Sequence, residues 1–159
     1  MDNNIIELSA NENGGLALEA SDEHYGSIHN LLKRGRGINM GDGWETRRRR
    51  EPGYDWIILK LGEAGIVDKI EIDTAHYKGN FPHQISINAA YLPNDCDKNM
   101  APRSLYWDEL LSIQLLEMDK QHFYENEIND IGPVTHIRVN IHPDGGLSRV
   151  RFFGKKHPS

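Results

Sequence analysis

The sequence contains a single cysteine, Cys96, among its 159 residues. No disulfide can therefore form within the chain, and no cluster of cysteines can hold a metal ion. Sparse cysteine is typical of a reducing compartment, so we expect a cytoplasmic location. The sequence also lacks any run of roughly 18 apolar residues, the length that a membrane-spanning helix needs. Its polar N-terminus has neither the basic start nor the apolar stretch of a signal peptide, so we expect no membrane partner.

Basic residues are in the minority, with 18 lysines and arginines against 24 aspartates and glutamates. The net charge of −6 argues against a nucleic-acid partner, because a general nucleic-acid binder needs a basic surface to displace counterions. Hydrophobic residues make up 38% of the chain, which is enough for a core and too many for a disordered protein. The length suits one domain. We place it at residues 16–155, with a flexible N-terminal segment at 1–15 and a C-terminal tail at 156–159.

Helical patterns are scarce, and short strands dominate the sequence. Four stretches alternate apolar and polar residues with a period of two, and residues 56–61 form a largely apolar run; the four stretches are 70–74, 85–89, 137–141 and 149–152. Glycine and proline signal turns between them, as at 62–65 and 143–146. Only residues 27–33 are expected to form a short helix, while 104–116 fits either a helix or a strand. This pattern predicts an all-β fold, a β-sandwich or jelly roll.

A first candidate site segment is Gly41–Arg50, which places carboxylates, an indole and four guanidiniums in one short stretch. Arginine forks suit a small carboxylate or urea-like ligand because they donate paired hydrogen bonds. If the stretch is extended, alternate arginines face opposite ways. A solvated basic loop, neutralised by Asp42 and Glu45, explains the same residues without any ligand.

A second candidate segment, residues 73–82, begins where a strand is expected to end. His76 there could act as a general acid or base, since histidine titrates near neutrality. Lys78 and Asn80 follow it in the loop. The alternative is a histidine that forms a hydrogen bond at the end of a strand.

The third candidate segment is residues 133–149. Ile137, Val139 and Ile141 are expected in the core, which puts His136, Arg138, Asn140 and His142 together on the opposite strand face. That polar face is either solvent surface, the default for a sandwich strand, or one wall of a site. Arg149 and Arg151 repeat the pattern after a turn, and a hairpin would place both polar rows on one sheet face.

Metal binding is weakly signalled. His76, His136 and His142 could act together with Asp73 or Asp144. Because no tight ligand spacing is present, we predict no metal site, and we leave the cofactor requirement open.

Stretches of all three segments, together with residues 20–26, 30–32, 35–40 and 55–56, resemble the allantoicase family, and the resemblance runs from residue 20 to 154. It implies a jelly-roll β-sandwich like that of galactose-binding domains. It also implies hydrolysis of allantoate to ureidoglycolate and urea, a step of purine degradation. Family chains usually carry two such repeats, and this chain is most similar to the second. The resemblance therefore implies a homo-oligomer, or a partner chain that carries the other repeat.

The three segments are then expected to meet in one concavity. We assign catalysis to Glu45, His76 and His136, and substrate binding to a larger set: Asp42, Trp44, Arg47, Arg49, Lys78, Asn80, Arg138, Asn140 and Arg149. Two other functions are compatible with the sequence. One is a non-catalytic jelly-roll module that binds a small ligand, and the other is a structural subunit that completes a partner repeat.

Overall fold

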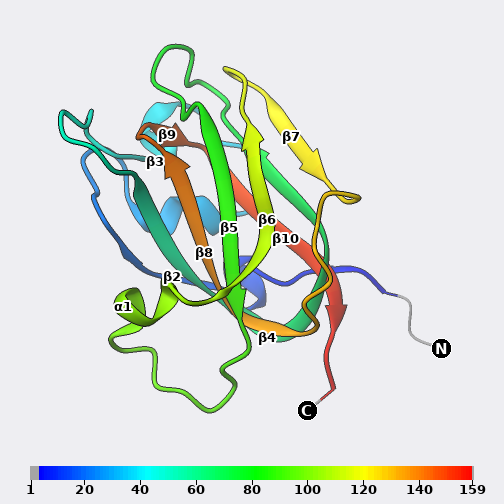
Figure 1. Ribbon diagram of the computed structural model, residues 1–159. Helices are drawn as coiled ribbons and strands as arrows, with labels where there is room; N and C mark the ends of the chain where they lie inside the picture. The colour runs from blue at the N-terminus through cyan, green and yellow to red at the C-terminus, as the bar shows by residue number, and fades with distance from the viewer. Residues whose placement is uncertain (1–3, 159) are drawn as a thin grey trace.

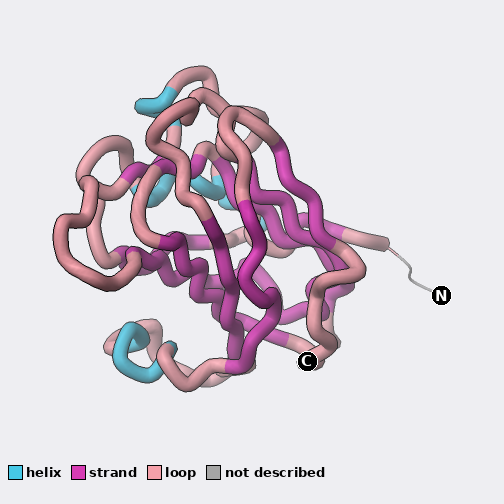
Figure 2. The backbone as a smooth tube through the Cα atoms, turned by 45° about the horizontal axis from the view of Figure 1, so that its top comes forward, coloured by secondary structure: helices cyan, strands magenta, loops and turns pink. Residues whose placement is uncertain are grey.

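Strands are the main regular secondary structure of the computed structural model, which describes residues 4–158 (Figure 1). The elements in chain order are β1 (Ile6–Glu7), η1 (Asn11–Asn13), β2 (Leu16–Ala20), η2 (Ile28–Leu32), η3 (Met40–Asp42), β3 (Trp44–Glu45), β4 (Asp55–Asp73), β5 (Gln84–Ala90), α1 (Met100–Ser104), β6 (Asp108–Leu115), β7 (Gln121–Tyr124), β8 (Val134–His142), β9 (Gly146–Leu147) and β10 (Arg149–Lys156). Figure 2 shows that helix is confined to short turns around the strands. No helix within the described residues is long and apolar enough to cross a membrane.

The strand β4 belongs to both layers of a sandwich. Its first part pairs with β2 and β8, and after a register shift between Lys60 and Gly65 its second part pairs with β10 and β7. The eight-stranded sheet therefore folds over on itself into the layers β2–β4–β8–β5–β6 and β1–β10–β4–β7. The turn predicted at 62–65 is wrong, because one continuous strand runs through these residues.

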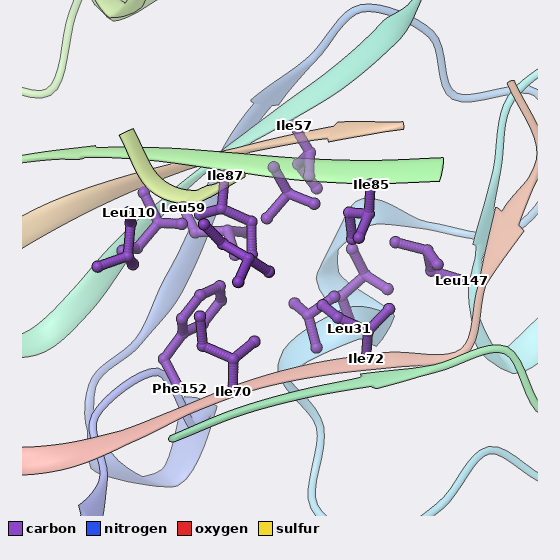
Figure 3. Packing of buried hydrophobic residues seen from close by; sticks show 14 of the residues in the cluster. Leu31, Ile57, Leu59, Ile70, Ile72, Ile85, Ile87, Leu110, Leu147 and Phe152 are labelled. Carbon is purple, nitrogen blue, oxygen red and sulfur yellow. The ribbon is translucent and has the colours of Figure 1, made fainter. Parts of the chain in front are cut away.

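The core lies between the two layers (Figure 3). Ile137, Val139 and Ile141 of β8 are fully buried, as their spacing predicts, and they face a core that also takes in Ile70 and Phe152 of the opposite layer. Burying each such side chain contributes about 1.5–3 kcal/mol. The prediction that the alternating strands pack as the two layers of a β-sandwich is thus confirmed.

The outer face of β8 is buried as well. Arg138 and Asn140 are each 4% exposed and His136 is 1% exposed. The segment that contains α1 packs on this face, and the Ser104 hydroxyl at the end of α1 accepts a hydrogen bond of 2.7 Å from Arg138. The default expectation of a solvated outer face is therefore wrong, because a local alternation pattern cannot reveal a distant segment that covers it.

The predicted hairpin between residues 134–142 and 149–151 is also wrong. β8 pairs with β4 and β5, whereas β10 pairs with β1 and with the second part of β4, so the two strands lie in different layers. The outer face of β10 is covered by residues 33–42, to which Arg149 and Arg151 donate hydrogen bonds. The two polar rows of the sequence consequently face opposite sides of the molecule.

The segment placed outside the domain, residues 1–15, contributes a strand from Ile6 and a core residue at Leu8. β1 pairs with β10, and Leu8 is 1% exposed. Residues 1–3 and 159 lie outside the described residues. The short helix expected at 27–33 is present as the 3-10 helix η2, whose first turn is capped by the Ser27 hydroxyl. The ambiguous stretch 104–116 resolves into the end of α1 followed by β6.

Candidate active site

Parts of the three candidate segments converge at one end of the sandwich, around the small sheet formed by β3 and β9 (Figure 1). Glu45 of β3 is the register partner of Gly146 of β9. The amide of Gly146 in turn donates a 2.8 Å hydrogen bond to the carbonyl of Asn80. Residues that lie far apart in the sequence are therefore fixed together by backbone contacts, which hold their relative positions more rigidly than side chains could.

Tyr77 packs beneath this junction and explains the glycine of β9. A Cβ atom at Gly146 would overlap the ring of Tyr77. Tyr77 is fully buried, and its hydroxyl donates a 2.7 Å hydrogen bond to the carbonyl of Met40. Burial and the nearby charge of Glu45 raise the pKa of Tyr77 well above its usual value, so the hydroxyl remains a donor. The contact anchors the loop that precedes β3.

Glu45 and Asn80 face a cavity of about 590 Å³. The amide nitrogen of Asn80 donates a 2.7 Å hydrogen bond to Oε2 of Glu45, and both side chains are half-buried. The polar side chains that line the cavity are those of Glu45, Thr46, Arg48, Arg49, Asn80, His83 and Asp144. The cavity thus brings carboxylates, guanidiniums, an imidazole and an amide together.

The arginine run follows β3 as a loop, so the strict alternation of an extended strand does not apply to it. Two hydrogen bonds hold Arg49 in place. Its backbone amide donates one of 2.9 Å to the Asp144 carboxylate, and its guanidinium donates one of 3.1 Å to Asp55. Arg48 is exposed and lines both this cavity and a neighbouring one of about 490 Å³. Arg47 lines only the neighbouring cavity. The sequence singled out Arg47 and Arg49, whereas the structure adds Arg48.

Asp42 and Trp44 lie next to the residues of the site but do not line the cavity. Asp42 accepts hydrogen bonds of 2.9 Å from Arg149 and 3.0 Å from Lys33. Burial acts to raise the pKa of Asp42, but these hydrogen bonds outweigh it and hold the pKa below its usual value. Trp44 is fully buried in the core, and its indole nitrogen donates 2.8 Å to the carbonyl of Asp22. Asp42, Trp44 and Arg149 therefore act as structural contacts.

The imidazole of His76 is engaged outside the cavity. Its Nε2 lies 2.7 Å from the carbonyl of Gly37, and its backbone amide donates 2.8 Å to Asp119. Its backbone has a φ of 77°, in the left-handed region, so this residue occupies a tight turn. Lys78 is exposed in the following loop and does not line the cavity either. Of the second segment, Asn80 is the predicted residue that reaches the cavity.

His136, Arg138 and Asn140 lie away from Glu45 in this chain. His136 is six residues before the end of β8 that leads to the cavity, a separation of roughly 20 Å along a strand. Its ring bonds to the Thr135 hydroxyl at 2.7 Å and to the Asp97 carboxylate at 3.1 Å. Burial lowers the pKa of His136 below its ordinary value and outweighs the bond to Asp97.

On the outer face of the sheet, Arg138 is covered by aromatic and polar side chains. It lies over the rings of Trp56 and Tyr54, at 4.8 and 5.7 Å from their centroids, and donates 2.8 Å to Asn140. Within the single chain, the prediction that His136 and Arg138 share a concavity with Glu45 is wrong.

Four further residues line the cavity that were not predicted as site residues from the sequence: Arg48, Phe81, His83 and Asp144. Arg48 lies in the arginine run of the first segment, and the sequence offered Asp144 as a possible metal ligand. His83 shows no local pattern that sets it apart. No group of three or more histidine, cysteine, aspartate or glutamate side chains is arranged to hold a metal within residues 4–158.

A family model matches almost the whole chain. The family model described as the allantoicase repeat matches residues 6–157. A curated relative named probable allantoicase, from Acinetobacter baumannii strain ATCC 17978, is 56% identical over 94% of this chain and 45% of its own length. A protein named probable allantoicase 1, from Burkholderia mallei, is 53% identical over 94% of this chain and 44% of its own. The chain spans a little less than half the length of these relatives.

Solved structures give the same result for the fold. The crystal structure of allantoicase from Saccharomyces cerevisiae matches 95% of this chain and 43% of that one, with a TM-score of 0.81 and 40% identity. A fucolectin from the serum of striped bass, Morone saxatilis, matches 96% of this chain and 48% of that one, with a TM-score of 0.69 and 12% identity. The second likeness concerns the fold alone, and it agrees with the predicted jelly roll resembling galactose-binding domains.

Proposed function

The chain belongs to the allantoicase family, and we propose that it hydrolyses allantoate to ureidoglycolate and urea at the cavity beside Glu45. Because it spans less than half of its curated relatives, the proposal covers the chain alone and the chain completed by the other repeat. The reaction breaks one carbon–nitrogen bond of a small anion. It therefore requires a base for water, a proton for the departing urea and a group that binds the substrate carboxylate.

The observation that carries the proposal is the Glu45–Asn80 pair in the cavity. Asn80 binds Oε2 of Glu45, while Oε1 accepts no hydrogen bond from any residue in 4–158. A carboxylate held by one oxygen presents the other in a fixed direction, which suits the removal of a proton from water. Glu45 is thus the proposed general base, and Asn80 is the residue that orients it.

Arg48 is the proposed partner of the substrate carboxylate. Its guanidinium makes no hydrogen bond or ion pair within the described part of the chain, in contrast to that of Arg49. A guanidinium fork donates two parallel hydrogen bonds to a carboxylate, which fixes both the position and the orientation of the anion. Arg49 instead holds the loop through Asp55 and Asp144, so it places Arg48 at the cavity.

The cavity suits a small substrate. Its volume of about 590 Å³ lies within the range of small-molecule sites, roughly 300–1,000 Å³. Its side chains include few apolar groups apart from Phe81 and Pro143. A ligand with one carboxylate and two urea groups can form hydrogen bonds with most of such a lining.

Urea release from allantoate tests the proposal directly. It should be measured with the purified chain alone and mixed with a chain that carries the other allantoicase repeat. Glu45→Gln should lower turnover by about 100-fold or more, the usual loss of an acid/base group, while allantoate binding persists. Glu19→Gln, on the exposed face of β2, is the matched control and should match the unchanged chain.

Binding of allantoate without urea release in either sample would instead identify a non-catalytic module. Absence of both binding and release would contradict the proposed substrate.

The assembly and the location are also proposals. We expect a homo-oligomer or a complex with the other repeat, because the relatives are more than twice as long as the matched region. Sedimentation over a wide concentration range tests this, and a monomer throughout would oppose the homo-oligomer. A cytoplasmic location is supported by the free, exposed thiol of Cys96.

A further inference from the structure

The proposed hydrolysis needs a proton donor for the departing urea, and the histidines first assigned to catalysis do not provide it. Four imidazoles of the chain are held by hydrogen bonds and do not line the cavity, namely those of His76, His122, His136 and His142. Three further histidines also lie outside its lining: His24, His29 and His157. Among the described residues, His83 is the histidine that faces the same cavity as Glu45.

The position of His83 combines a fixed backbone with a free side chain. Its amide donates 3.1 Å to the carbonyl of His142, and its own carbonyl accepts 3.0 Å from the amide of Leu116. These bonds tie the residue to the start of β5. The side chain is exposed, and its one ring contact is with Phe81, at 6.1 Å between centroids. Neither ring nitrogen bonds to another described residue, so both are available to a ligand.

The other acidic group of the cavity, Asp144, is less suited to donate a proton. Its Oδ2 accepts a 2.9 Å hydrogen bond from the backbone amide of Arg49. This contact commits that oxygen to accepting a hydrogen bond from the loop that carries the arginines. Glu45 is likewise hydrogen-bonded by Asn80 and is already assigned as the base. This leaves the imidazole of His83 as the remaining proton donor among the described residues that line the cavity.

We propose that His83 is the general acid that protonates the departing urea, an inference that rests on the proposed function. The bond between the central carbon of allantoate and one ureido nitrogen breaks, and its electron pair leaves with the nitrogen. That nitrogen takes the proton of the His83 imidazolium. The oxygen of one water bonds to the carbon, and the released proton passes to Glu45. The products are ureidoglycolate and urea, and transfer of the proton from Glu45 back to His83 through water restores the site.

The test compares urea release by the unchanged chain, His83→Gln, His83→Ala and the control His29→Gln, each alone and with the other repeat. His83→Gln should lower kcat by about 100-fold or more, while KM changes by less than about threefold. Free imidazole should restore part of the activity of His83→Ala, because it can enter the vacated space and donate the proton. A structural role for the side chain would not produce such a rescue. His29→Gln, at an exposed position in η2, should retain full activity.

Each outcome decides the proposal. Activity of both His83 variants within threefold of the unchanged chain overturns the donor role and leaves the proposed function standing. A loss in His83→Ala that imidazole does not restore, in a variant that still unfolds at the normal temperature and binds allantoate, also overturns it. If the unchanged chain releases no urea in either setting, the proposed function fails and the donor role fails with it.

Discussion

The amide of Asn80 lies 2.7 Å from the carboxylate of Glu45, although 35 residues separate them in the sequence. The contact is possible because Gly146 bonds to the backbone of Asn80 and pairs with Glu45 at the same time. Two short strands and one loop thereby form a single unit. The side-chain hydrogen bond can be removed without disturbing the backbone bonds that create it.

Replacing Asn80 should therefore lower activity more than stability. Asn80→Ala removes the donor that orients Glu45, and we expect kcat to fall by about 10-fold, equivalent to about 1.4 kcal/mol. Asn80→Asp should cost more, since it places two carboxylates against each other. Urea-release kinetics and thermal unfolding measure the two effects. An unchanged kcat in Asn80→Ala would show that Asn80 does not orient Glu45 for catalysis.

A methyl group at Gly146 should disrupt the same unit through packing. Gly146→Ala pushes a Cβ atom into the ring of the buried Tyr77, so we expect a loss of about 1–3 kcal/mol of unfolding free energy. Gly79→Ala is the matched control, because a Cβ atom at Gly79 meets nothing within 4 Å. Chemical denaturation should show a large loss of unfolding free energy for Gly146→Ala and a negligible change for Gly79→Ala. Equal stability of both would mean that the junction tolerates a shift of Tyr77.

Arg138 should prove to be a structural residue. It is 4% exposed, and its guanidinium donates to Ser104, Asn140 and Tyr54, none of which is charged. Arg138→Ala removes these bonds and the packing against Trp56, and should cost about 2–4 kcal/mol. Arg138→Met keeps most of the volume and should cost less. If Arg138→Ala left denaturation unchanged and raised KM for allantoate, the residue would belong to substrate binding after all.

Stability should fall as the pH drops from 7 toward 5. Burial depresses the pKa of both His136 and His142 below the ordinary value of 6.5. In this window the unfolded chain binds more protons than the folded chain, so the unfolding free energy rises with pH. Their contribution is fully present above about 6.5 and is lost as the pH falls toward the folded pKa values.

Urea denaturation between pH 5 and 7.5 measures this slope, and His136→Gln should flatten it. The carboxylates Asp42 and Asp97 have lowered pKa values, so their contribution is lost only at more acidic pH, below about 4. A slope in His136→Gln as steep as in the unchanged chain would show that His136 is not its source.

The strands were predictable because the alternation of apolar and polar residues along a strand reflects which of its faces is buried. Ile137, Val139 and Ile141 point inward whatever else the chain does, and the core confirms them. The passage of β4 between layers was not predictable, since Gly62 and Gly65 signal a turn as readily as a bent strand. The cover over Arg138 depends on Ser104, 34 residues away, which no pattern around β8 reveals.

The candidate site was predictable in part for the same reason. Residue types pointed to Glu45 and Asn80, and both residues line the cavity. They also pointed to His76 and His136, which do not line the cavity. His76 is taken by the carbonyl of Gly37, 39 residues away, and His136 by Asp97, also 39 residues away. Which histidine stays free depends on such long-range partners, so His83 emerges only from the folded chain.

The shared strand β4 couples the unfolding of the two layers. It pairs with β2 and β8 on one side of its bend and with β7 and β10 on the other. Neither layer can open fully without exposing backbone amides in both, so partial opening of the sandwich is costly. Amide protons along β4 should consequently exchange with solvent at similar slow rates in both halves, through unfolding of the entire domain.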